Sequence, residues 1–184
     1  MKPERWTLSL ALSIAAAAAA PDAVGALHVG DTAPAFVAEA ALGGRQFTFD
    51  LSETLKKGPV VLYFYPKAFT SGCTVEAHEF AEATERFRQL GATVIGMSTD
   101  DIDTLKKFSV LECRDKFAVA ADSGARVTKQ YDAALFKRAD LADRISYVIA
   151  PDGKVIYSYA SMDPDKHVEN TLQAVQRWKD SARP

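Results

Sequence analysis

The side chains with the most distinctive chemistry in this chain are its two cysteines, Cys73 and Cys113. Cys73 closes the loop of residues 66–73, which follows the apolar run of residues 60–65 and leads into an amphipathic stretch. Such a run is typical of a strand buried on both faces, and the change of pattern indicates a strand-to-helix turn. At a helix N-terminus, the partial positive charge and the unpaired backbone N–H groups stabilise a thiolate, the reactive form of cysteine. Cys73 is therefore a candidate nucleophile.

The segment after Cys73 has the periodicity of a helix. Charged residues, including Glu76, lie largely between its apolar positions, which are Val75, Phe80, Ala83, Phe87 and Leu90. Gly91 is typical of a residue that follows the last turn of a helix. We therefore expect one long helix that begins close to Cys73 and ends before Gly91.

The rest of the chain alternates predicted strands and helices. Residues 46–50 are expected to form an edge strand, residues 93–98 a buried strand, and residues 117–121 a short strand. A helix is expected over residues 100–113, ending at Cys113, and a short one over residues 125–131. Residues 145–150 and 155–159 flank a Pro-Asp-Gly turn and predict a hairpin. Asp163 and Pro164 are expected to cap a last helix with Val168, Leu172, Val175 and Trp178 on one face.

This order of elements predicts an α/β fold, with a central mixed sheet and helices on both faces. Residues 27–184 are long enough for one domain with a substantial core and too short for two ordinary domains. No internal repeat and no linker divides them.

Residues 1–26 have the pattern of a secretory signal. A short basic start precedes an uncharged, mostly apolar stretch over residues 6–20, and small residues lead to an expected cut after Ala26. The alternatives are an uncleaved anchor and a wrongly assigned start. We expect a cleaved signal peptide and export, for example to the periplasm, without membrane attachment of the mature chain.

Composition excludes several classes of partner. The formal net charge is −2, with acidic and basic residues interspersed, so nothing indicates binding to nucleic acid. The three histidines, His28, His78 and His167, share no ligand spacing, so we expect no metal site. No other pattern indicates a cofactor.

The loop and its surroundings resemble the active site of the peroxiredoxins, which are thiol peroxidases on a thioredoxin-like fold. The motif Pro66-x-x-x-Thr70-x-x-Cys73 carries the resemblance, together with Cys73-Thr74-x-Glu76, a Gly-Asp-x-Ala-Pro segment at residues 30–34, and Arg144 before a strand. The order of elements is similar to that of the bacterioferritin comigratory protein and PrxQ branch. The resemblance implies a peroxidase that reduces hydrogen peroxide and organic hydroperoxides.

Each motif residue also has a physical reason to be in such a site. A peroxide reacts with a thiolate that is in line with its O–O bond and near donors for the departing oxygen. The Thr70 hydroxyl can orient the peroxide, the Pro66 ring can wall the pocket, and the Arg144 guanidinium can hold thiolate and peroxide together. Glu76 resembles the carboxylate that fixes this arginine in the family. The alternatives are that Thr70 is only a helix N-cap, Pro66 a turn residue, Arg144 a solvated arginine and Glu76 an exposed helix charge.

The sulfenic acid formed at Cys73 has to be trapped by a second thiol. Many PrxQ relatives carry that thiol five residues after the nucleophile, where this chain has His78. Cys113 matches a less common family pattern, with the resolving cysteine on the next helix, and a Cys73–Cys113 disulfide within one chain would require local unwinding. A bridge between subunits and an external thiol stay open. The resemblance also implies reduction by a thioredoxin-like protein and a monomer or weak homodimer.

Two other functions remain as alternatives. A thiol-disulfide oxidoreductase shares the fold but normally uses Cys-x-x-Cys, whereas Thr74, Val75 and Glu76 follow Cys73 here. An exported domain with a purely structural Cys73–Cys113 disulfide is the non-enzymatic alternative, since oxidising compartments favour such bonds.

Overall fold

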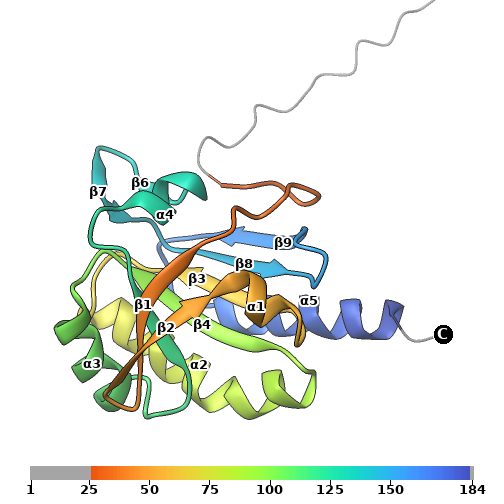
Figure 1. Cartoon of the computed structure of the whole chain (residues 1–184), viewed down its shortest axis with the longest axis horizontal. Helices are drawn as coiled ribbons and strands as arrows, with labels where there is room; N and C mark the ends of the chain where they lie inside the picture. The colour runs from red at the N-terminus through yellow and green to blue at the C-terminus, as the bar shows by residue number, and fades with distance from the viewer. Residues whose placement is uncertain (1–25, 183–184) are drawn as a thin grey trace, which may run out of the picture.

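The structure is a computed structural model that describes residues 26–182, so residues 1–25 of the predicted signal peptide lie outside the described residues. A seven-stranded sheet with the order β2-β1-β5-β4-β3-β8-β9 forms its centre (Figure 1). Strands β3, β4 and β5 run parallel and the other neighbours pair antiparallel, which makes the sheet mixed. The strands are β1 (Val37–Leu42), β2 (Arg45–Asp50), β3 (Val60–Phe64), β4 (Thr93–Ser98), β5 (Ala118–Ala121), β8 (Ile145–Ile149) and β9 (Val155–Ala160).

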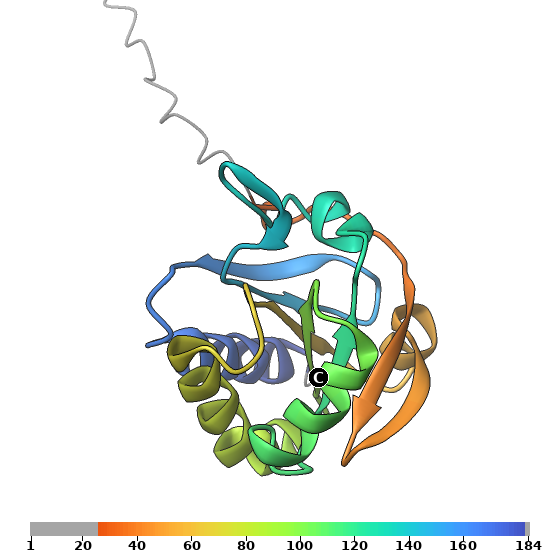
Figure 2. The same cartoon turned by 90° about the vertical axis from the view of Figure 1, so that its left-hand side faces the viewer.

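Helices cover both faces of this sheet, as predicted. On one face lie α2 (Ser71–Gln89), α3 (Ile102–Leu111) and α5 (His167–Ser181). On the other lie α1 (Leu51–Leu55), α4 (Arg126–Gln130) and a small hairpin of β6 (Ala134–Leu135) and β7 (Arg138–Ala142). Figure 2 shows α2, α3 and α5 below the sheet, with α4 and the hairpin above it. Within residues 26–182, no helix combines the length and apolar character that a membrane span requires.

Strand β3 divides the core in two and leads directly to the reactive loop. All five of its residues are buried, and it lies between β4 and β8. Because side chains alternate along a strand, Val61 and Tyr63 pack under α2, α3 and α5, whereas Leu62 and Phe64 face the other layer. The predicted strand buried on both faces is confirmed, and α2 follows it as the crossover to the parallel strand β4.

Two helix predictions were wrong in detail. On α2, Val75 was expected on the apolar face but is 44% exposed, whereas the full burial of Glu76 agrees with its expected place beside Arg144. Helix α5 begins at His167 after Lys166, whose φ is +75°, and not at Asp163 and Pro164. The Asp163 carboxylate instead accepts from the Asp165 backbone N–H, so it closes a turn that precedes the helix.

Three strands were not predicted. Strand β1 is rich in alanine, and its buried residues, Ala40 and Ala41, carry little apolar signal. Strand β6 has two residues, and β7 alternates too weakly to stand out. The predicted edge strand, β2, pairs with β1 at the margin of the sheet.

Candidate active site

Cys73 lies in the first turn of α2, as predicted. Thr70 is the N-cap residue, and its backbone carbonyl accepts from the Thr74 N–H at 2.9 Å. The Cys73 side chain is 2% exposed and packs in the core layer under α2 and α3. The strand-to-helix turn thus presents a shielded sulfur at a helix N-terminus, where backbone dipoles favour negative charge.

Arg144, directly before β8, completes the immediate surroundings of the sulfur. Its Nη2 donates to Cys73 Sγ at 3.4 Å, its Nη1 donates to Glu76 Oε2, and its Nε donates to the Met162 carbonyl at 3.1 Å. The guanidinium is therefore held on three sides, and Arg144 as a whole is 3% exposed. A Cβ at Gly72 would lie 3.0 Å from Nη2, so glycine leaves room for this approach.

Glu76 fixes Arg144 from inside the molecule. Burial raises the pKa of Glu76 to about 8, although the Arg144 charge acts in the opposite direction. Burial lowers the pKa of Arg144, but the charges of Glu76 and Cys73 outweigh it, so the pKa is raised overall. The second carboxylate oxygen, Glu76 Oε1, is buried without a hydrogen-bond partner and lies 3.7 Å from His167 Nδ1. The alternative of an exposed helix charge is thus wrong for Glu76.

His167 is the site residue that sequence reasoning missed. It is fully buried, with Nδ1 2.8 Å from Ser146 Oγ and Nε2 3.0 Å from the Ser161 carbonyl oxygen. Burial lowers the pKa of His167 to about 4. A signal was present, because His167, Thr171 and Val175 share the helical spacing of the buried face of α5.

Thr70 and Pro66 lie in the loop between β3 and α2 that leads to Cys73. The Thr70 side chain is exposed, and its hydroxyl donates to the Lys67 carbonyl at 2.9 Å and makes no helix-capping bond. Pro66 is half-buried and follows β3 by two residues. The loop is tied to the neighbouring strand end because the Asp100 carboxylate accepts from the Ala68 backbone N–H at 2.7 Å. The roles of Thr70 and Pro66 stay predictions.

Cys113 lies two residues beyond α3 and is fully buried. Both cysteines are free thiols, and both belong to the same core layer. Burial is the main cause that raises the pKa of the Cys113 thiol, and the negative charges of Glu112 and Asp115 raise it further. Next to Cys113, Glu112 Oε2 lies 2.7 Å from His78 Nε2 on α2. His78 therefore joins two helices and is more than a surface residue.

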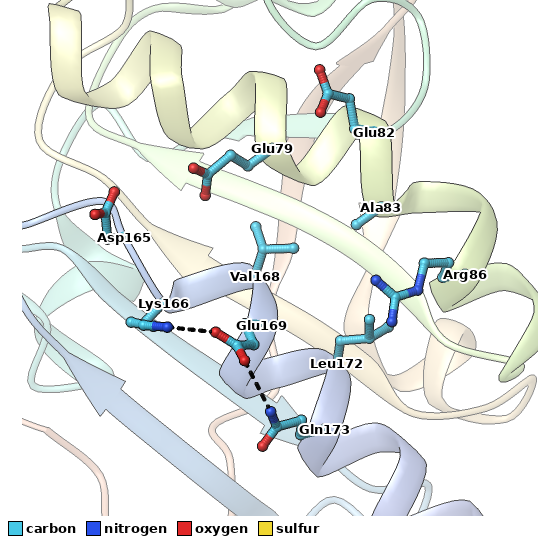
Figure 3. Close-up of a pocket in the computed structure, with 10 residues that line it drawn as sticks. All are labelled: Glu79, Glu82, Ala83, Arg86, Asp165, Lys166, Val168, Glu169, Leu172 and Gln173. Carbon is cyan, nitrogen blue, oxygen red and sulfur yellow. Dashed lines mark hydrogen bonds and ion pairs between the residues drawn. The ribbon is translucent and has the colours of Figure 1, made fainter.

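A groove of about 700 Å³ between α2 and α5 lies apart from the thiol (Figure 3). Acidic residues from both helices line it, including Glu79 and Glu169, and burial together with Asp165 raises the pKa of Glu79. The lining residues of the groove include no cysteine. Among residues 26–182, no group of three or more possible ligands could hold a metal ion.

Known proteins share this sequence and architecture. The AhpC/TSA family matches residues 29–158. The chloroplastic peroxiredoxin Q of Triticum aestivum is 38% identical over 130 residues, which are 70% of this chain and 59% of that protein. The chloroplastic peroxiredoxin Q of Populus jackii is 32% identical over 174 residues, which are 94% of this chain and 79% of that protein.

A solved structure has the same fold. The crystal structure of peroxidoxin BcpB from Mycobacterium tuberculosis superposes with a TM-score of 0.74 at 30% sequence identity, covering 85% of this chain and 98% of that one. The chain spans less than two thirds of the length of several sequence relatives; of the Triticum aestivum protein, for example, it covers 59%. The family match over residues 29–158 and the shared fold nevertheless establish that this chain belongs to the AhpC/TSA family, in agreement with its resemblance to the peroxiredoxins.

Proposed function

We propose that the protein is a thiol-dependent peroxidase that reduces hydrogen peroxide and organic hydroperoxides at Cys73. The observation that carries this proposal is the contact of 3.4 Å between Arg144 Nη2 and Cys73 Sγ, inside a shielded site at the start of α2. A fixed cation and a helix N-terminus at one sulfur favour the thiolate. The family and its relatives support the same chemistry.

In the first step, the Cys73 thiolate attacks the terminal oxygen of the peroxide. An S–O bond forms and the O–O bond breaks, so that the sulfur loses two electrons and the peroxide gains them. The transferred oxygen keeps its hydrogen, which gives a sulfenic acid, and the departing alkoxide or hydroxide takes one proton. Arg144 faces the region where this negative charge develops, which is the placement that lowers a barrier.

Thr70 and Pro66 would act on the substrate and not on the sulfur. The Thr70 hydroxyl donates to the Lys67 carbonyl in the structure, and a peroxide bound at Cys73 would offer it another acceptor. The half-buried Pro66 ring would exclude water without requiring a partner for a backbone N–H. Both residues therefore orient and shield the reaction in this proposal.

The second step joins Cys73 to Cys113. The Cys113 thiol attacks the sulfenic sulfur, a disulfide forms, and water leaves; two thiols of a thioredoxin-like reductant then restore both cysteines and become a disulfide themselves. Because Cys113 is buried and its pKa is raised, it has to move before it reacts. We further propose that the mature chain is exported and works as a monomer or weak homodimer.

Peroxide consumption by the reduced protein tests the proposal. Wild type should consume about one equivalent of peroxide without a reductant and many with one, and Cys73→Ser should consume none. Cys113→Ser should consume one equivalent and form no intramolecular disulfide, as judged by mass spectrometry. Full consumption by Cys73→Ser would contradict the proposal, and unchanged turnover of Cys113→Ser would remove Cys113 from the mechanism.

A further inference from the structure

The turn between β9 and α5 contacts both the main chain and the side chain of Arg144. Strand β9 ends at Ala160, and α5 begins at His167. Within the turn, the Ser161 backbone N–H donates to the Arg144 backbone carbonyl at 3.1 Å. The Met162 carbonyl accepts from Arg144 Nε, also at 3.1 Å. The arginine that reaches the sulfur is therefore oriented in part by residues 161–162.

Hydrogen bonds hold this short segment in place. The Met162 side chain is 54% exposed, so it does not anchor the segment in the core. The Ser161 hydroxyl accepts from the Asp163 backbone N–H at 3.2 Å, which is a bond within the turn itself. The Ser161 carbonyl, in contrast, reaches inward: its oxygen lies 3.0 Å from Nε2 of the fully buried His167. This contact links the segment to the buried layer.

The His167 ring can serve as such a link because it is itself held in place. A backbone carbonyl can only accept, so Nε2 carries the hydrogen that goes to Ser161. In the neutral ring, Nδ1 is then an acceptor, and the Ser146 hydroxyl donates to it at 2.8 Å. Tyr159 packs an aromatic edge against the ring, with the two ring centres 4.8 Å apart. Ser146 follows Arg144 by two residues, so both side chains point to the same face of the sheet.

Glu76 does not provide a second route from His167 to the arginine. Its free oxygen, Oε1, lies 3.7 Å from Nδ1, which is longer than a hydrogen bond, and the lone pair of Nδ1 already accepts from Ser146. The hydrogen-bonded path from the histidine to Arg144 therefore runs through the main chain of residues 161–162.

We propose that His167 is a positioning residue that acts on Cys73 through Arg144. By holding the Ser161 carbonyl, it fixes the neighbouring Met162 carbonyl, which orients the guanidinium. The guanidinium is planar, and Glu76 at Nη1 together with the Met162 carbonyl at Nε fixes its rotation. With only one of these two anchors in place, the plane can pivot, and Nη2 leaves its position 3.4 Å from the sulfur.

Two conservative substitutions of His167 test this path. In His167→Gln, the longer amide can place a donor where Nε2 lies and keep the bond to Ser161. In His167→Asn, the shorter amide can still accept from Ser146 and loses the bond to Ser161. We expect His167→Asn to react with peroxide about tenfold more slowly than wild type, and His167→Gln to stay within about threefold of it. The opposite order, equal losses in both variants, or no loss in either would overturn the proposal.

A double-mutant cycle separates this role from a loss of stability. In an Arg144→Lys background, His167→Asn should change the rate by less than about twofold, because a lysine has no Nε for the Met162 carbonyl to hold. A loss as large as in the wild-type background would show that His167 acts by another route and would overturn the proposal. Val175→Ala, which removes two buried methyl groups from the same helix, is the control for lowered stability and should keep the wild-type rate.

Nitrogen-15 NMR of the reduced wild type tests the link without substituting His167. The ring should carry its hydrogen on Nε2 and leave Nδ1 unprotonated, with the signals of the other two histidines identified in His28→Gln and His78→Gln. A hydrogen on Nδ1 alone would exclude donation to the Ser161 carbonyl. That result would overturn the proposal even if both variants at position 167 failed to fold.

Because the inference rests on the proposed peroxidase, a readout without peroxide keeps the two apart. Iodoacetamide reacts with the thiolate, so at neutral pH it should alkylate Cys73 about threefold more slowly in His167→Asn than in wild type or His167→Gln. Equal rates in all three proteins would overturn the proposal. A wild type that consumes no peroxide would refute the proposed function, whereas alkylation and NMR would still test the role of His167.

Discussion

At the scale of single residues, Arg144 joins the reactive cysteine to its buried surroundings. One guanidinium reaches Cys73, Glu76 and the Met162 carbonyl at the same time, and it does so in a fixed plane. A lysine ammonium has the same charge but lacks this fork, so it cannot hold all three partners in one geometry. The position of the positive charge beside the sulfur therefore depends on the planar shape of the guanidinium, and not on its charge alone.

We predict that Arg144→Lys lowers the rate of peroxide reduction by about 10²-fold, the usual effect of losing one fixed donor at a developing charge. Initial rates of peroxide consumption measure it. Arg138→Lys is the matched control, because Arg138 pairs with Asp140 in an exposed position and should keep wild-type activity. A variant Arg144→Lys that is as active as wild type would show that charge alone is sufficient.

The residues that were predictable in this site are those that a short motif connects. Cys73 and Glu76 lie three positions apart on one helix, and Arg144 stands at the start of a strong strand, so type and spacing indicated them. His167 and Ser146 come together only through the packing of α5 against β8. No local pattern contains that contact, which is why the histidine was placed on its helix without a role.

At the scale of elements, the segment after α3 has a strained backbone and is linked to α2 through side chains. Arg114 and Asp115 follow Cys113 with φ values of +52° and +59°, a left-handed conformation that costs non-glycine residues free energy. The segment is held to α2 by His78 and Glu112, whose side chains are 34% and 19% exposed, and by the more exposed pair of Arg114 and Glu82. The backbone strain and these two links, of which the first is the more buried, therefore bear on how easily Cys113 leaves the core.

We predict that His78→Ala speeds formation of the Cys73–Cys113 disulfide by about fivefold, because the lost hydrogen bond contributes about 1 kcal/mol to the closed state. Stopped reactions with peroxide, followed by thiol trapping and mass spectrometry, measure the rate. The free energy of unfolding should fall by a similar amount. Glu85→Ala is the control on the same helix. Unchanged or slower disulfide formation would show that opening of this segment does not limit the step.

Packing between strands β3 and β4 depends on a glycine. Gly96 pairs with Tyr63, and a Cβ there would lie 2.7 Å from Tyr63 Cζ. The tyrosine ring has no room to move, since it stacks on Phe80 with centroids 4.3 Å apart. We predict that Gly96→Ala lowers the free energy of unfolding by about 1–3 kcal/mol. Urea denaturation tests this, and Gly124→Ala, which meets no atom within 4 Å, should change little.

The predictability of the elements follows their apolar content. Strands β3, β4 and β8 are dominated by apolar residues, and the long helix α2 repeats apolar residues at helical spacing, so all four were recognised. Strand β1 buries only alanines and owes its place to pairing with β2 and β5. The start of α5 was misplaced because Asp163 closes a turn of its own before the helix.

At the scale of the whole molecule, the site places charged groups inside one of the two core layers. Burial raises the pKa of Glu76 from 4.5 to about 8, so between these pH values the folded chain binds more protons at Glu76 than the unfolded chain. Stability then falls as pH rises through this window. Burial lowers the pKa of His167 from 6.5 to about 4, so its contribution rises with pH between those values. Below pH 6.5 the two effects on stability oppose each other, and above pH 6.5 the effect of Glu76 is the larger one.

We therefore predict that the free energy of unfolding falls by about 1 kcal/mol between pH 6.5 and 8, since one pKa unit corresponds to about 1.4 kcal/mol, Glu76 is only half titrated at pH 8, and the remaining titration of His167 offsets part of the loss. Urea denaturation at a series of pH values measures it. Glu76→Gln carries no titrating group at this position and should have a flat profile, whereas Glu85→Gln, which changes an exposed carboxylate, should keep the wild-type slope. A wild-type profile as flat as that of Glu76→Gln would mean that Glu76 is already charged at pH 6.5 and that Arg144 compensates its burial fully.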